Sequence, residues 1–167
     1  MSNKNIAKSV RQKLLNKAKS EGRPFGDLLL YYGIERFLYR LSLSRYKNNF
    51  FLKGALMFFV WHSPSPRSTR DIDFLGRTDN SVANIETIFQ EICDITYEPD
   101  GIQWLPESIN VSVTQNRRAY AGACVIFRGK LDAAVIPIWI DIGFADVIYP
   151  KPVALNYPAL LDMDVVE

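Results

Sequence analysis

Two neighbouring stretches decide the fold: Phe50-Phe51-Leu52-Lys53-Gly54-Ala55 and Arg67-Ser68-Thr69-Arg70-Asp71-Ile72-Asp73-Phe74. The first is predicted to be a short strand that ends at a glycine and opens a helix. The second is predicted to be a strand. Residues i and i+2 of a strand point to the same face, so Asp71 and Asp73 point together. Their charges repel unless a cation, usually a divalent metal, lies between them. Two solvated aspartates at a strand edge are the alternative.

The composition is that of one globular domain. The chain has 167 residues, of which 48% are hydrophobic and 23% charged, enough for one substantial core. No apolar run approaches the roughly 20 residues that cross a bilayer, and the first residues lack the apolar stretch of a signal peptide. We therefore expect a cytoplasmic protein with no membrane partner. Cys93 and Cys124 are expected to be buried free thiols, and the single histidine, His62, excludes a multi-histidine metal site.

The charge is distributed unevenly, although the net charge is only +2. Residues 1–48 hold 11 Lys and Arg against 3 Asp and Glu, whereas residues 49–167 hold 9 against 15. This imbalance indicates either a polyanionic partner for the basic part or lysines that coat exposed helix faces. We expect residues 1–48 to form a basic N-terminal helical segment that packs on a core formed by 49–167, in a single domain overall.

Apolar periodicity predicts several helices. The predicted helices cover 5–20, 26–32, 34–43, 55–61 and 82–93. Gly33 is expected to break the second from the third. The helices of the basic segment are expected to turn their apolar residues inward and their basic residues outward.

Period-two patterns predict a set of short strands. The predicted strands cover 50–53, 70–75, 102–105, 109–113, 120–129 and 136–143, with 130–135 as a connection. Pro150, Pro152 and Pro158 argue against a long helix near the end of the chain. The expected fold class is α/β, a small mixed β-sheet with packed helices and an N-terminal helical layer.

A third carboxylate lies in the last predicted strand, Ile136-Pro137-Ile138-Trp139-Ile140-Asp141-Ile142-Gly143. Trp139 and Asp141 share one of its faces, and we expect that face to be buried because the strand is so apolar. A buried carboxylate needs a partner or a metal. If the strand lies beside 70–75, Asp141 converges with Asp71 and Asp73 on a site that suits Mg²⁺. A salt bridge to Arg70 or Arg128 is the alternative.

The order of these motifs resembles a known family. Lys53-Gly54-Ala55, then Asp71-Ile72-Asp73-Phe74, then Asp141-Ile142-Gly143-Phe144 is similar to the pattern of the AbiEii/AbiGii (MenT-type) toxins, which are nucleotidyltransferases of the polymerase-β superfamily. Segments 9–15, 34–42 and 157–162 extend the resemblance. It implies a metal-dependent enzyme that transfers a nucleotide from a nucleoside triphosphate to an RNA acceptor, with tRNA expected. Such an enzyme would be the toxin of a toxin–antitoxin pair, with the cognate antitoxin as a candidate partner.

The resemblance also implies roles for individual residues. Asp71, Asp73 and Asp141 would bind Mg²⁺ (or Mn²⁺) and form the catalytic set, and Asp141 would help to deprotonate the incoming hydroxyl. Gly54 and Ala55 would offer backbone N–H groups to phosphate oxygens at a helix N-terminus. The full set of nucleotide-binding candidates is Lys53, Gly54, Ala55, Arg67, Thr69 and Arg70.

Two departures from the family pattern leave alternatives open. Ala55 stands where many superfamily members have serine. Family members also continue into a helical half with a nucleotide-contacting lysine, so we expect a chain that is truncated C-terminally. A non-catalytic or truncated module of this fold that binds RNA or a partner protein is the alternative function. A third interpretation is that the aspartates are unrelated and lie far apart in an α/β domain.

Overall fold

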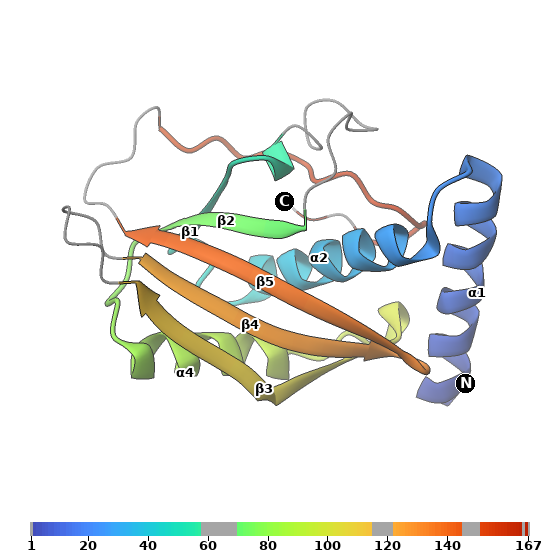
Figure 1. Cartoon of the computed structure of the whole chain (residues 1–167), viewed down its shortest axis with the longest axis horizontal. Helices are drawn as coiled ribbons and strands as arrows, with labels where there is room; N and C mark the ends of the chain where they lie inside the picture. The colour runs from blue at the N-terminus through green and yellow to red at the C-terminus, as the bar shows by residue number, and fades with distance from the viewer. Residues whose placement is uncertain (1, 58–69, 115–121, 145–150, 165, 167) are drawn as a thin grey trace.

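The computed structural model describes residues 2–57, 70–114, 122–144, 151–164 and 166. Helices and strands occur together, which confirms the predicted α/β class (Figure 1). The helices are α1 (Asn3–Glu21), α2 (Phe25–Leu43) and α4 (Val82–Asp94), with the 3-10 turn η1 (Glu98–Asp100). The strands are β1 (Phe50–Lys53), β2 (Asp71–Gly76), β3 (Ile102–Thr114), β4 (Gly122–Leu131) and β5 (Ala134–Phe144).

The five strands form one mixed sheet in the order β1-β2-β5-β4-β3. β2 and β5 run parallel to each other, and the other three neighbouring pairs are antiparallel. β5 is the last strand in the chain but lies between β2 and β4. The insertion of β5 next to β2 is what brings the two motif-bearing strands together.

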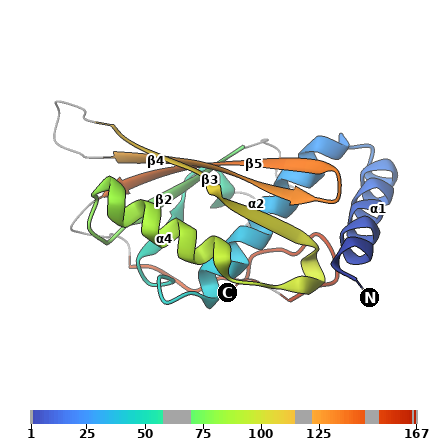
Figure 2. The same cartoon turned by 90° about the horizontal axis from the view of Figure 1, so that it is seen from below.

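Helices α2 and α4 pack on the same face of this sheet (Figure 2). Phe37 of α2, Phe89 of α4 and Phe127 of β4 form an aromatic cluster in the core, with ring centroids 5.0–6.2 Å apart. Burying one such side chain contributes roughly 1.5–3 kcal/mol. The opposite face exposes large side chains, with Val135 48% and Trp139 46% exposed. We call it the open face.

Helix α1 stands across the end of the β4–β5 hairpin (Figure 1). Its buried stripe is Ala7, Val10, Leu14 and Ala18, the i, i+3, i+4 spacing of one helical face. It ends at Gly22, whose φ of 63° is the left-handed conformation that glycine favours at helix ends. The helix predicted over 5–20 is thus confirmed. Among the described residues, no helix is long and apolar enough to cross a membrane.

The prediction that Gly33 breaks a helix is wrong. α2 runs without interruption through this position. A Cβ atom at residue 33 would lie 2.5 Å from Cγ2 of Ile136, so the glycine lets α2 approach β5 closely. The expectation that the basic residues of this segment point outward is wrong for Arg36 and Arg40, which are 0% and 1% exposed.

The strands in the second half are longer than predicted. The two short strands expected over 102–105 and 109–113 are one strand, β3, with a shift of register between Leu105 and Asn110. The connection expected over 130–135 is also wrong, because β4 continues to Leu131 and β5 begins at Ala134. A tight turn suffices there, since Asp132 adopts the left-handed conformation with φ 54°.

A buried ion pair joins α2 to η1. Arg40 donates two hydrogen bonds to the carboxylate of Asp100, from Nη1 to Oδ2 at 2.5 Å and from Nη2 to Oδ1 at 3.2 Å. Both side chains are almost completely buried. Arg40 Nε also donates to the carbonyl of Ile95, and Asp100 accepts from the backbone N–H of Ile102. The pair therefore fixes the chain on both sides of η1 against α2.

The last described segment is tied to the same helix. Glu35 and Arg36, neighbours on α2, pair through Oε1 and Nη2 at 2.5 Å. The other oxygen of Glu35 accepts from the backbone N–H of Leu160 at 2.9 Å, and Arg36 Nη2 donates to the carbonyl of Asp164 at 2.7 Å. Residues 151–164 contain no helix and take part in only one isolated bridge, so buried polar contacts hold this segment in place.

Candidate active site

Four side chains form a line across the open face. Lys53 of β1 pairs in register with Asp73 of β2, Asp73 pairs with Asp141 of β5, and Asp141 pairs with Cys124 of β4. Neighbouring strands lie about 4.8 Å apart, so each of these residues is next to the following one. We call these four residues the polar row. The predicted adjacency of the strands that carry Asp73 and Asp141 is therefore found.

Alternation along the strands explains why the polar row faces away from the helices. Ile72 and Phe74 are buried, whereas Asp71 is exposed and Asp73 half-buried. In β5 the buried residues are the isoleucines, and Asp141 is exposed. The expectation that the face of Trp139 and Asp141 is buried is wrong, because the helices cover the isoleucine face. Within the described part of the chain, no ion pair joins Asp141 to Arg70 or Arg128.

The electrostatics of the row centre on Asp73. Partial burial raises the pKa of this carboxyl above its ordinary value, and the negative charge of Asp141 raises it further. The positive charge of Lys53 acts in the opposite direction, and Asp71 adds a smaller repulsion. Because these charges act on one group, the three aspartates and Lys53 share one electrostatic environment. A cation placed among them would relieve the repulsion.

Gly54 allows the chain to turn directly beside Asp73. Its φ of 74° lies in the left-handed region, where a side chain is disfavoured. A Cβ atom here would overlap the Asp73 carboxylate. The backbone N–H of Met57 donates to the carbonyl of Gly54 at 3.1 Å, and Leu56 and Met57 are helical. The rest of the helix predicted over 55–61 lies outside the described residues.

We expect Gly54→Ala to destabilise the protein. The left-handed conformation costs a residue with a side chain about 1–2 kcal/mol, and the added methyl group must also push the Asp73 carboxylate aside. Urea denaturation followed by circular dichroism measures the loss. Gly26→Ala is the matched control, because no atom would lie within 4 Å of its new Cβ and it lies within the first turn of α2. Equal stability of both variants would contradict this account of Gly54.

Cys124 differs from its prediction. It is a free thiol, as expected, but it is half-buried on the open face, whereas Cys93 is buried. Burial raises the pKa of the Cys124 thiol, and the charge of Asp141 and a hydrogen bond to Asp141 raise it further. The thiol therefore stays protonated at neutral pH. The contact with Asp141 could not be found from sequence, because it depends on the register between β4 and β5.

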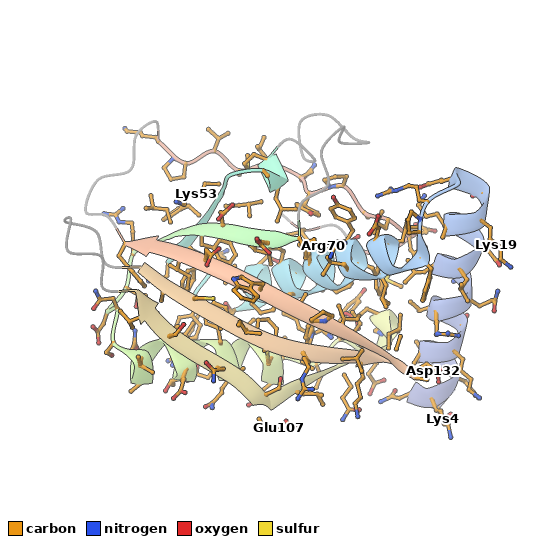
Figure 3. The ribbon with its side chains drawn as sticks, viewed as in Figure 1. Lys4, Lys19, Lys53, Arg70, Glu107 and Asp132 are labelled. Atoms are coloured by element: carbon orange, nitrogen blue, oxygen red, sulfur yellow. The ribbon has the colours of Figure 1, made fainter. Side chains whose placement is uncertain are left out.

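The remaining nucleotide-binding candidates do not lie together. Arg67 and Thr69 fall outside the described residues. Arg70 comes immediately before β2 and lines a pocket of about 460 Å³, three residues before Asp73, which pairs with Lys53. Figure 3 labels both cations. Ala55 follows Gly54 and is half-buried.

This pocket lies beside the first half of β5, before the point at which β2 begins to pair with it. Its walls come from the first turns of α2 and from Val135–Trp139 of β5, with Arg70 and Asp71 at one end. We call it the edge pocket, and the residues that matter most for its chemistry are Gly26, Asp27, Leu30, Arg70, Asp71 and Trp139. Sequence reasoning placed Trp139 on the face of Asp141 but missed the pocket, which α2 and β5 form together.

The donor set suits a hard divalent cation. The carboxylates of Asp71, Asp73 and Asp141 are oxygen ligands, which Mg²⁺ and Mn²⁺ prefer. In the part of the chain that the structure describes, no group of three His, Cys, Asp or Glu side chains is already arranged to hold a metal ion. Mg²⁺ commonly binds one or two carboxylates together with water and substrate phosphates, so the pair Asp73–Asp141 fits that mode better than a closed protein cage.

Comparison with known proteins adds one finding. A family model described as the nucleotidyl transferase AbiEii toxin of type IV toxin–antitoxin systems matches residues 36–166. The matched part contains β1, β2, β4 and β5, and with them the whole polar row. No curated protein and no solved structure matches the chain.

Proposed function

Because the chain belongs to the AbiEii family of nucleotidyl transferase toxins, we propose that it transfers a nucleotide from a nucleoside triphosphate to an RNA acceptor on the open face of its sheet. The observation that carries the proposal is the register of two parallel strands, which puts Asp73 directly beside Asp141. The raised pKa of Asp73 supports it, because burial and then the negative charge of Asp141 act together on this carboxyl. Such pairs are characteristic of functional sites.

The proposed reaction is a phosphoryl-group displacement. The oxygen of an acceptor hydroxyl bonds to the α-phosphorus, the bond from that phosphorus to the pyrophosphate oxygen breaks, and pyrophosphate leaves. The hydroxyl proton passes to a base, for which Asp141 is the candidate because it is exposed at the centre of the row. Divalent ions held by Asp71, Asp73 and Asp141 would neutralise charge on the phosphates when bound.

The donor triphosphate is assigned to the β1 end of the row. Lys53 brings a positive charge next to Asp73, and a lysine is a suitable point charge for phosphate. Gly54 and Ala55 lie where the chain turns into a helix, so their backbone N–H groups are candidates for phosphate contacts. Arg67 and Thr69 remain candidates for the same group from the sequence alone.

Helix α1 supports RNA as the acceptor. Exposed lysines lie along it at positions 4, 8, 13 and 19, and its first acidic residue is Glu21. Figure 3 labels Lys4 and Lys19 at the two ends of this helix. A surface of lysines attracts the phosphate backbone of a nucleic acid. Transfer to tRNA is the specific form of the proposal that we would test first.

A transfer assay tests the function. The whole chain is incubated with each labelled nucleoside triphosphate, Mg²⁺ or Mn²⁺, and total tRNA. Label should appear in RNA with the wild type. With Asp71→Ala the rate of transfer should fall at least a hundredfold, which is the typical effect of removing one group that stabilises charge in the transition state. Glu107→Gln, at an exposed position on β3, should behave as the wild type. Equal transfer by wild type and Asp71→Ala would contradict an enzymatic role for the three aspartates.

A second function is favoured by one observation, the lack of a preformed three-residue metal group among the described residues. It is a non-catalytic module of the same fold that binds RNA or an antitoxin. Thermal melting separates the two proposals. A nucleotide-binding enzyme melts at a higher temperature with triphosphate and Mg²⁺, whereas a module without a nucleotide site melts at the same temperature with and without them.

A further inference from the structure

The edge pocket adjoins the polar row, and the proposed reaction assigns no ligand to it. β5 begins at Ala134, but its parallel pairing with β2 begins only at Trp139. The edge of β5 before Trp139 therefore has no neighbouring strand among the described residues on the β2 side. The first turns of α2 stand opposite this edge, and the space between them is about 460 Å³. Pockets of about 300–1,000 Å³ hold small organic groups, and a nucleoside is a group of that size.

Trp139 gives this pocket an aromatic surface. Trp139 is 46% exposed, so its indole ring is open to contact from a ligand in the pocket. Trp139 pairs in register with Asp71 on one side and with Ile126 on the other. Two residues later on the same strand face comes Asp141. A base stacked on Trp139 would therefore lie two residues along β5 from Asp141, close to the paired carboxylates.

Arg70 brings a positive charge to one end of the pocket, while Asp27 and Asp71 also line it. Arg70 is exposed at the start of β2, and no carboxylate forms an ion pair with it among the described residues. An arginine in this position can bind a backbone phosphate. The other cation of the site, Lys53, is on the far side of Asp73, next to Gly54. The two cations thus lie at different places, Lys53 on β1 and Arg70 just before β2, so each can bind a separate phosphate group.

We propose that the edge pocket is the acceptor subsite, which binds the terminal nucleotide of the RNA with its base stacked on Trp139 and its phosphate on Arg70. This inference rests on the proposed nucleotide transfer. It places the terminal hydroxyl next to Asp141, on the β5 side, while the triphosphate occupies the β1 side. Any base can stack on an aromatic ring. The subsite therefore recognises an unpaired RNA end and has little preference for its sequence.

Binding of a labelled single-stranded RNA hexamer to the whole chain tests the subsite without catalysis. We expect Trp139→Ala to weaken binding about tenfold or more, since a stacked base is lost, and Trp139→Phe to keep most of the affinity. Arg70→Gln should weaken binding. It should also lower the slope of log binding constant against log salt concentration by about one, since one phosphate contact is lost. Leu43→Ala is the control, because Leu43 is a 54% exposed apolar residue at the end of α2. A wild type that does not bind the hexamer, or Trp139→Ala with unchanged affinity, would overturn the proposal.

Kinetics separate this inference from the function on which it rests. With transfer observed, Trp139→Ala and Arg70→Gln should raise the KM for tRNA and leave the KM for the triphosphate unchanged, and Lys53→Gln should do the reverse. If Trp139→Ala raises only the KM for the triphosphate, the pocket holds the donor base and the acceptor assignment is wrong. If hexamer binding depends on Trp139 but no nucleotide is transferred, the proposed function fails and the RNA site stands.

Discussion

Replacing Asp73 by asparagine is expected to abolish nucleotide transfer and, at neutral pH, to make the folded protein more stable. Asp73 is held beside Asp141 by the parallel register of β2 and β5, and burial and the charges of Asp141 and Asp71 raise its pKa. Asparagine keeps the shape and removes the charge. Like charges on directly opposed strand residues cost about 0.2–1 kcal/mol, which is the gain expected in the free energy of unfolding. Transfer should fall roughly a hundredfold or more.

The pH dependence of this gain follows from the direction of the pKa shift. The pKa of Asp73 is higher in the folded than in the unfolded chain, so folding favours the protonated form. Its contribution to stability is therefore complete below the unfolded pKa and is lost as the pH rises through the folded pKa. Asparagine has no such loss. The stability difference between Asp73→Asn and the wild type should thus be largest at neutral pH and shrink toward acidic pH.

Thermal melting across pH, with and without Mg²⁺ or Mn²⁺, measures both parts of the prediction. A divalent ion should raise the melting temperature of the wild type, because binding to the folded state stabilises it, and should do so less for Asp73→Asn. Glu107→Gln removes one charge far from the row and is the charge-matched control (Figure 3). A variant that melts below the wild type at neutral pH would show that Asp73 is structural, and the prediction that its charge destabilises the folded protein would be wrong.

Asp100→Asn is expected to cost about 3–5 kcal/mol of unfolding free energy, since it leaves the Arg40 guanidinium charged and uncompensated in the protein interior. Arg40 is 1% and Asp100 0% exposed, and two hydrogen bonds join them. Domains of this size are stable by only about 5–15 kcal/mol. The loss is therefore a large part of the total, and low yield of folded protein at elevated temperature should accompany it.

Chemical denaturation of four chains tests the ion pair: the wild type, Asp100→Asn, Arg40→Met and the double variant. If the penalty comes from an isolated buried charge, the double variant should recover part of the stability that Asp100→Asn loses, because neither charge remains. Glu91→Gln is the control for an exposed pair, since Arg45 and Glu91 pair at the surface. Surface pairs contribute little. A stability of Asp100→Asn close to that of Glu91→Gln would refute the predicted role of burial.

The parts of the fold that could be predicted were those that leave a local pattern. Alternation marked β2 and β5, and the positions of Asp73 and Asp141 within them followed directly. Gly54 was marked by its place between an apolar strand and a helical turn. These predictions needed only the period of each element and the place of a glycine at the end of a strand.

The parts that could not be predicted depend on which elements meet. Alternation shows that Ile140 and Asp141 face opposite ways, but not that the helices would cover the isoleucine side. Gly33 was misread because a glycine is needed there only to let α2 approach β5 closely. The residue it approaches, Ile136, lies 103 residues later in the sequence. Arg40 was expected at the surface for the same reason, since its partner Asp100 is distant in sequence.

The division of the sheet into a covered face and an open face has a consequence for the evolution of this protein. Substitutions at Lys53 or Trp139 change a surface that carries none of the core, whereas substitutions at Ile72 or Phe127 remove buried apolar contacts. A lineage can therefore exchange residues of the open face one at a time and still inherit a folded scaffold. Divergence in substrate choice should accumulate there, while the helix-covered side of the same strands changes slowly.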